Sequence, residues 1–163
     1  MTAGSSEPLA GGVLPSALDP APAALVIAEA RRWVGTPYLH QASTRGAGCD
    51  CLGLARGIWR ALHGAEAGPI PAYTPFWGET GRREVLLEAL RARMIGIPPD
   101  LAAPGALLVF RMAPGRLAKH CGILIEGGRM IHAMQGAGVI ETGCDRSWRR
   151  RTVAAFLFPR GGR

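Results

Sequence analysis

The fold is decided by residues 46–62, which read GAGCDCLGLARGIWRAL. Glycines and small polar residues end at Cys51. Aliphatic residues then recur at the i, i+4, i+8 spacing of a buried helical stripe, at Leu54, Ile58 and Leu62. The pattern therefore predicts a helix whose first residue is Cys51.

A thiol at the start of a helix has a distinctive environment. It lies near unpaired backbone N–H groups and the positive end of the helix dipole, and both favour the thiolate over the thiol. The same N–H groups can stabilise the oxyanion that forms when a thiolate attacks a carbonyl. Taken alone, Cys51 fits two interpretations, a nucleophile or a buried cysteine at the start of a core helix.

The composition is that of a globular protein. The 163 residues are 48% hydrophobic and 19% charged, which excludes wholesale disorder, and no run of about 18 apolar residues is present to span a bilayer. We expect a flexible arm rich in Pro, Gly and Ala at residues 1–22, one domain at residues 23–159 and a basic tail at residues 160–163.

The chain is strongly basic, with a formal net charge of +7 and a pI of about 10.2. Such a charge favours polyanions, which include nucleic acids, acidic wall polymers and acidic protein surfaces. No motif that reads RNA or DNA accompanies the charge, so we expect no specific nucleic-acid binding. A solvated basic face remains the simpler alternative.

The cysteine pattern and the N-terminus both indicate a protein made in the cytoplasm. Cys49 and Cys51 are separated by one residue, which does not fit a disulfide framework, so we expect reduced thiols. No Lys or Arg precedes Arg31, and prolines interrupt the first 22 residues. We therefore expect no secretion signal.

Helical patterns come first and strand patterns second, which favours an α+β fold with N-terminal helices packed on an antiparallel sheet. We expect helices at 23–34, from residue 51 onward, and at 82–94, with a long ordered loop or lid at 63–80. The expected core positions of the first helix are Leu25, Ile27, Ala28 and Val34. The expected strands are 106–110, 120–125, 129–134, 138–140 and 153–158.

Two histidines fall on the predicted hairpin around Gly127-Gly128. A cysteine nucleophile, a histidine base and a polar group that orients the histidine form the minimal cysteine-hydrolase arrangement, in which His120 is the base and His132 orients it. A strict two-residue turn would place the two histidines on opposite faces of the sheet. We therefore predict a three-residue loop at residues 127–129 or a bulge near Lys119.

Other interpretations of these residues stay open at this point. Each histidine alone fits a surface or hydrogen-bonded structural role, and His63 is expected to interact with the C-terminal end of its helix. A metal site is also possible in principle, although the spacings do not match paired C-x2-C zinc knuckles, and we predict no metal. The residues considered for it are Cys49, Cys51, His120, Cys121, His132 and Cys144.

Four segments, in order, resemble the motifs of the NlpC-type cell-wall cysteine peptidases. They are Gly35–Tyr38, Gly48–Leu54, His120–Ile125 and Met130–Ala133. Three further segments are similar to the branch of this family that is encoded in phage tail gene clusters and gene transfer agents. They are His40–Ser43, Arg56–Arg60 and Tyr73–Pro75. The resemblance extends over residues 24–158.

The resemblance implies a papain-like fold and a cysteine peptidase domain at residues 23–159. It implies Cys51 as the nucleophile, His120 as the general base and His132 as the orienting residue. Tyr38 matches a tyrosine near the nucleophile. Asp50 matches an acidic residue that binds the free amine of the substrate in some members, and it is also a candidate helix cap.

The implied substrate is the peptidoglycan stem peptide, cleaved between γ-linked D-Glu and a diamino acid, with no cofactor. The implied partners are tail tip or hub proteins of a phage-like particle that acts on periplasmic peptidoglycan during DNA delivery. Leu52 replaces a common Ser, and His40-Gln41 replace an aromatic residue and Gly, which bears on substrate specificity. The alternatives are an amidase or acyltransferase of the same fold and a non-catalytic tail component with a vestigial or metal-binding site.

Overall fold

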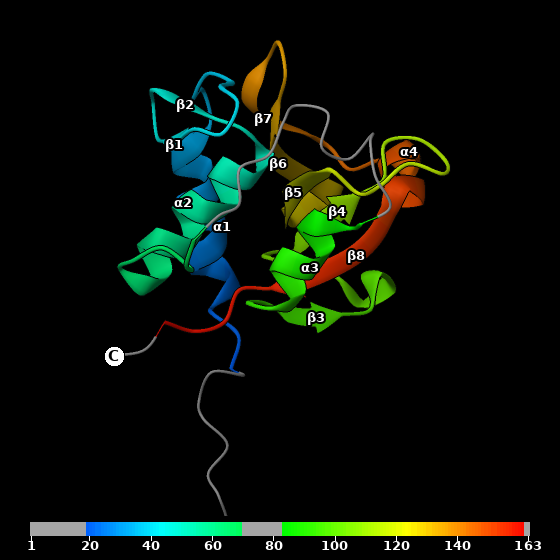
Figure 1. Ribbon diagram of the computed structural model, residues 1–163, viewed down its shortest axis with the longest axis horizontal. Helices are drawn as coiled ribbons and strands as arrows, with labels where there is room; N and C mark the ends of the chain where they lie inside the picture. Colours follow the sequence, from blue (N-terminus) through cyan, green and yellow to red (C-terminus); the bar gives the residue numbers. More distant parts are fainter. Residues whose placement is uncertain (1–18, 70–82, 162–163) are drawn as a thin grey trace, which may run out of the picture.

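The computed structural model describes residues 19–69 and 83–161. It has the predicted α+β architecture, in which a six-stranded antiparallel sheet carries helices on both sides (Figure 1). The strand order is β3-β8-β4-β5-β6-β7. The strands are β3 Ile95–Ile97, β4 Leu107–Phe110, β5 His120–Ile125, β6 Arg129–Met134, β7 Gly138–Gly143 and β8 Thr152–Leu157.

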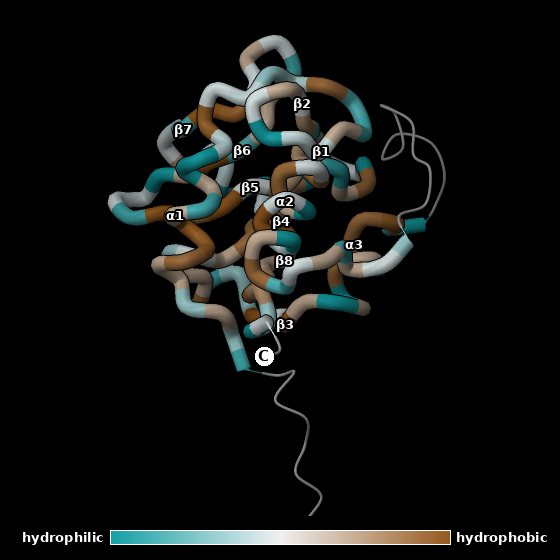
Figure 2. Tube along the Cα trace, turned by 90° about the vertical axis from the view of Figure 1, so that its left-hand side faces the viewer, coloured by the Kyte–Doolittle hydropathy of each residue, from teal (hydrophilic) through white to brown (hydrophobic). Residues whose placement is uncertain are grey.

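Two helices, α1 and α2, pack together on one side of the sheet, and α4 lies on the other side (Figure 1). When the molecule is turned so that α1 and α2 face the viewer, α2 runs across the front of hydrophobic strands (Figure 2). The helices are α1 Ala23–Trp33, α2 Cys51–His63, α3 Val85–Arg91 and α4 Arg146–Arg151. Short 3-10 turns occur at η2 Pro99–Leu101 and η3 Glu126–Gly128, and a two-stranded ribbon pairs β1 Ser43–Thr44 with β2 Gly48–Cys49.

Alternation along the strands divides the core between the two faces of the sheet. On β5, Cys121 and Ile123 face α1 and α2 and belong to the larger hydrophobic cluster. On β4, Leu108 and Phe110 face the other side and form a smaller cluster against Trp148 of α4. Both histidines of the hairpin lie on the same face of the sheet as this second cluster.

The core face of α1 differs from the one expected. Of the four predicted positions only Ile27 is buried, whereas Leu25 and Val34 are 56% and 45% exposed, and Ala28 is also exposed. The observed core positions are Val26, Ile27, Ala30 and Trp33. The bulky Trp33 determines which side of α1 faces the core, because its ring packs on Gly57 of α2. The buried side of the helix is therefore the side that carries Trp33.

The third helix is shorter than predicted at both ends. Arg83 and Glu84 precede α3, where the Glu84 carboxylate accepts hydrogen bonds from Arg111 and from the N–H of Ala118. The helix ends at Arg91 because the chain turns into β3, which pairs with β8 and was not predicted. The arginine-rich segment at residues 146–151 is itself a helix, α4, capped by Asp145.

The hairpin turn confirms the predicted three-residue loop, which lies one residue earlier than the expected 127–129. Ile125 pairs with Arg129 and Ile123 with Ile131, so the loop holds three residues, 126–128. Gly127 and Gly128 both have positive φ, which glycine adopts without steric cost. This register places the two histidines on the same face of the sheet.

The segments that precede and follow the domain in the sequence lie side by side. Pro20 forms a bridge with Pro159, and the N–H of Ala21 donates to the carbonyl of Phe158. The predicted lid falls largely outside the described residues, as do most of the predicted arm and the end of the basic tail. None of the helices in the described part of the chain has the length and apolar character needed to cross a membrane.

Candidate active site

Asp50 fixes the start of α2 and thereby the position of Cys51. Its Oδ1 accepts a hydrogen bond from the N–H of Gly53 at 2.7 Å, which is an N-cap, and its Oδ2 accepts from the N–H of Gln41 at 2.8 Å. Its side chain is only 3% exposed. Of the two roles left open for Asp50, this geometry supports the helix cap.

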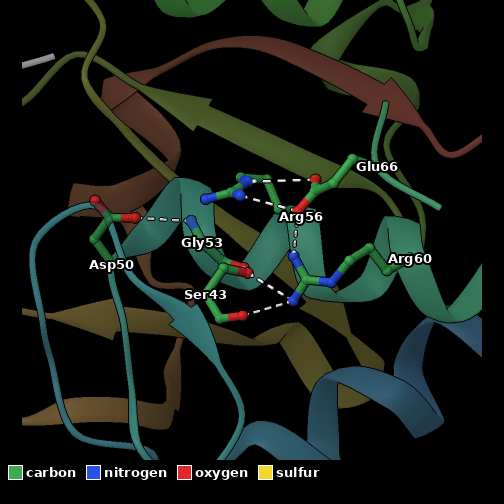
Figure 3. Close-up of polar contacts among 6 residues, drawn as sticks. All are labelled: Ser43, Asp50, Gly53, Arg56, Arg60 and Glu66. Carbon is green, nitrogen blue, oxygen red and sulfur yellow. Dashed lines mark hydrogen bonds and ion pairs between the residues drawn. The ribbon is translucent and has the colours of Figure 1, made fainter. Parts of the chain in front are cut away.

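A polar network holds the preceding loop onto α2 (Figure 3). The hydroxyl of Ser43 donates to the carbonyl of Gly53, and Arg60 donates to both the carbonyl and the hydroxyl of Ser43. Glu66 accepts from Arg60 and from Arg56, so one carboxylate fixes both arginines. The network ties the loop before the nucleophile to the middle of the helix.

The first turn of α2 also needs a glycine. A Cβ at Gly53 would lie 1.9 Å from the carbonyl oxygen of Ala42, which is shorter than any allowed contact. The close approach lets the loop pack directly on the helix backbone. Sequence reasoning identified Cys51 as the first helical residue, and the structure places it there.

Cys51 is half-buried, and its surroundings favour the thiolate. Hydrogen bonds with the Cys121 thiol and the His120 imidazole lower the pKa of Cys51 to about 5, against the opposing effect of burial. Sγ of Cys121 also lies 3.4 Å from the carbonyl oxygen of Cys51. Contact with Cys51, together with burial, raises the pKa of Cys121, so Cys121 stays protonated and donates.

His120 and His132 form a directly bonded pair. Nε2 of His120 lies 2.9 Å from Nδ1 of His132, and both residues are buried. Since Nε2 of His120 contacts His132, its Nδ1 is the nitrogen left for Cys51. The structure therefore brings together the three residues that the sequence assigned to one site, in the order Cys51, His120, His132.

Three residues that contact the histidine pair were not predicted as part of this site. Nε2 of His132 lies 2.9 Å from the hydroxyl of Thr142, because β7 continues beyond the predicted strand 138–140. The Trp148 ring packs against both histidines, with centroids 5.7 Å from His120 and 5.2 Å from His132. Phe110 stacks on His120 at 5.8 Å.

The aromatic rings shield the histidine pair from water and limit the tilt of both imidazoles. Extending the strand pattern to Thr142 would have shown that it shares a face with His132. The position of Trp148 has no comparable signal, because it depends on a short helix crossing the far side of the sheet.

Tyr38 lies beside the nucleophile. It forms a parallel bridge with Cys49, and burial together with the negative charges of Cys51 and Asp50 raises the pKa of Tyr38 to about 12. The phenol is therefore a hydrogen-bond donor at any physiological pH. It fits the predicted supporting role, which remains a prediction.

The remaining predicted residues lie in structural positions. Nδ1 of His63 lies 3.0 Å from the carbonyl oxygen of Trp59 and its ring stacks on that indole, so His63 interacts with the end of α2 as expected. All four cysteines are free thiols, and Cys49, Cys121 and Cys144 are buried. Among residues 19–69 and 83–161, no group of three His, Cys, Asp or Glu side chains is arranged to hold a metal ion.

The NlpC/P60 family sequence model matches residues 35–156, a segment that contains the whole Cys-His-His arrangement. The fold is similar to the crystal structure of the NlpC/p60 domain of the peptidoglycan hydrolase SagA. That comparison has a TM-score of 0.56 and 26% identity, and it covers 85% of this chain and 100% of that one. No curated protein sequence matches the chain.

Two further structures share the fold at lower identity. An NlpC/P60 family protein from Bacillus cereus gives a TM-score of 0.59 at 19% identity and covers 87% of this chain. The peptidoglycan hydrolase RipB from Mycobacterium tuberculosis gives 0.52 at 19% identity and covers 86%. This chain spans 42% of the first protein and 65% of the second.

Proposed function

Because the chain belongs to the NlpC/P60 family, we propose that it is a cysteine peptidase that hydrolyses peptide bonds in the stem of peptidoglycan. The observation that supports this most is the 2.9 Å contact between His120 and His132, together with the influence of His120 in lowering the pKa of Cys51 at the start of α2. The SagA domain, which the chain covers completely, comes from a protein named as a peptidoglycan hydrolase.

The chemistry follows from the geometry. His120 takes the proton of Cys51, and the thiolate attacks the carbonyl carbon of the scissile amide. The N–H groups of α2 that precede the capped Gly53 have no acceptor within the helix and stabilise the oxyanion. His120 then protonates the leaving amine, and water hydrolyses the thioester with His120 as base.

His132 keeps the imidazole of His120 in the productive orientation during both steps. Burial, and then the charge of His120, lower the pKa of His132 to about 4, so His132 remains neutral. A neutral imidazole accepts a hydrogen bond at one nitrogen only. Accepting at Nδ1 stabilises the His120 imidazolium that forms after proton transfer.

We propose the bond between γ-linked D-Glu and the diamino acid as the site of cleavage, on the basis of the motif resemblance. The buried Asp50 carboxylate accepts from two backbone N–H groups, so it would contact the free amine of the stem peptide only through its remaining lone pairs. His40, whose Nδ1 lies 3.8 Å from Oδ2 of Asp50, marks the adjacent surface where this chain departs from common family residues.

The test is digestion of purified sacculi by the wild type, Cys51→Ala and Cys144→Ala, with the products identified by mass spectrometry. Cys144 is a matched control because it is a buried free thiol that follows β7 and takes part in none of the contacts described above for Cys51. We expect new peptide ends from the wild type and Cys144→Ala, and none from Cys51→Ala. Release of intact stem peptides from the glycan would instead identify an amidase. Equal release by Cys51→Ala would exclude a cysteine peptidase.

We further propose that the protein acts on the tail of a phage-like particle and opens periplasmic peptidoglycan as DNA is delivered. The support is the resemblance of residues 40–43 and 56–60 to that branch. Particles purified from cells that encode the chain should contain it, as detected by antibody. Particles that carry Cys51→Ala should assemble with normal tails but deliver DNA poorly. Normal delivery by these particles would exclude this role.

A further inference from the structure

Thr142 belongs to the strand at the edge of the sheet, beside the strand that carries His132. Ile140 is the direct cross-strand partner of His132, and Met130 is the partner of Thr142. Residues two positions apart on a strand share a face, so Thr142 and His132 are diagonal neighbours. Their contact joins Oγ1 to Nε2 at 2.9 Å.

Proton transfer from Cys51 restricts the hydrogen bonds that this pair can make. Once His120 is an imidazolium, both of its nitrogens carry protons, so Nδ1 of His132 must accept. His132 is neutral, and its single proton then has to lie on Nε2. The hydroxyl of Thr142 is the group that this proton reaches.

The other neighbour of the His132 ring cannot replace this acceptor. Trp148 packs edge-on to the ring with an interplanar angle of 88°. An indole N–H is a donor only. Trp148 limits the tilt of the ring, whereas Thr142 supplies the acceptor that favours the tautomer protonated at Nε2 before His120 takes up the proton.

We propose that Thr142 is a positioning residue that accepts a hydrogen bond from Nε2–H of His132 and holds His132 in the tautomer that receives the His120 proton. This proposal rests on the hydrolase function proposed above. The resulting chain of contacts runs from Cys51 through both histidines to Thr142 and crosses three adjacent elements, α2, β5 and β6, to reach β7.

The experiment compares Thr142→Val, which keeps the shape but removes the acceptor, with Thr142→Ser, which keeps the acceptor. Thr44→Val is the matched control, because Thr44 is an exposed strand threonine in the small β1–β2 ribbon. Nitrogen-15 NMR of the histidine rings reports the tautomer of His132. Steady-state hydrolysis of a murein-derived peptide reports kcat and KM.

We expect the wild type, Thr142→Ser and Thr44→Val to show His132 protonated at Nε2. Thr142→Val should show a mixture of tautomers, with kcat lowered on the order of tenfold and KM unchanged. An unchanged tautomer in Thr142→Val would overturn the proposal. So would equal loss of kcat in Thr142→Ser and Thr142→Val, because it would assign the effect to packing.

The NMR measurement separates this proposal from the proposed function. A folded wild type without hydrolase activity would contradict the function. The tautomer of His132 in Thr142→Val would still decide whether Thr142 controls it.

Discussion

At the residue scale, the reactivity of Cys51 depends on a second thiol. Cys121 follows the candidate base directly on β5, and alternation turns its side chain to the opposite face from His120, toward α2. Its hydrogen bond is the largest influence that lowers the pKa of Cys51. The imidazole of His120 and the thiol of Cys121 thus both lower the pKa of Cys51 from one end of β5, and the thiol also lies 3.4 Å from the carbonyl oxygen of Cys51.

We predict that alkylation of Cys51 by iodoacetamide follows a pH midpoint near 5 in the wild type. Cys121→Ala removes a donor to the thiolate, so the pKa of Cys51 should rise and its alkylation at pH 6 should slow several-fold. Mass spectrometry of the peptide that contains Cys51 measures the rate.

Cys121→Ser, which keeps a donor, and Cys144→Ala serve as controls and should stay close to the wild type. An unchanged midpoint in Cys121→Ala would show that Cys121 does not influence the nucleophile.

The sequence predicted the three central residues because each stands in a motif with a chemical reason for its position. It did not predict Thr142, Trp148 or the contribution of Cys121. These depend on neighbours across strands and on the far face of the sheet, which local periodicity does not encode.

At the element scale, the packing of α1 on α2 depends on the absence of a side chain at Gly57. A Cβ there would lie 1.9 Å from the Trp33 ring, which is 3% exposed and hydrogen-bonded to Glu29. The indole therefore lies directly on the helix backbone. This contact also explains why the sequence mispredicted the buried face of α1.

We predict that Gly57→Ala separates α1 from α2 and lowers the free energy of unfolding by about 1–3 kcal/mol, despite the better helix propensity of alanine. Urea unfolding followed by circular dichroism measures the change. Gly143→Ala is the control, because a Cβ there meets nothing within 4 Å. Stability of Gly57→Ala equal to the wild type would mean that Trp33 moves without cost.

Element types were predictable where periodicity was long, as in α1, α2, β5 and β6. A two-residue turn would have put the two histidines on opposite faces of the sheet, so the sequence also predicted an irregular hairpin. The three-residue turn at 126–128 confirms it. The short elements β3 and α4 were missed. β3 is held in place by its pairing with β8. α4 has only six residues, is rich in arginine and is capped by Asp145.

At the scale of the whole molecule, folding buries His132 in its neutral form. The folded pKa of about 4 lies below the usual 6.5, so the unfolded chain binds more protons between these values. The contribution of His132 to the free energy of unfolding is fully present above pH 6.5. It is lost as the pH falls from 6.5 through 4.

We predict that acidification from pH 7 to pH 4.5 costs the wild type on the order of 2 kcal/mol more than it costs His132→Gln, which lacks the titrating group. Urea unfolding at several pH values measures the difference. Parallel pH profiles for the two proteins would contradict this assignment.

The two ends of the described domain also determine how it would carry mechanical load. Ala21 is bonded to Phe158, and the N–H of Arg160 donates to the carbonyl of Asp19, so both flanks leave from one place, away from the start of α2 (Figure 1). Tension applied through one flank would act on a single point at the base of the domain. Tension applied across both flanks would therefore act first on the hydrogen bonds that join Ala21 to Phe158 and Asp19 to Arg160, and not on the packing of α2 against β5.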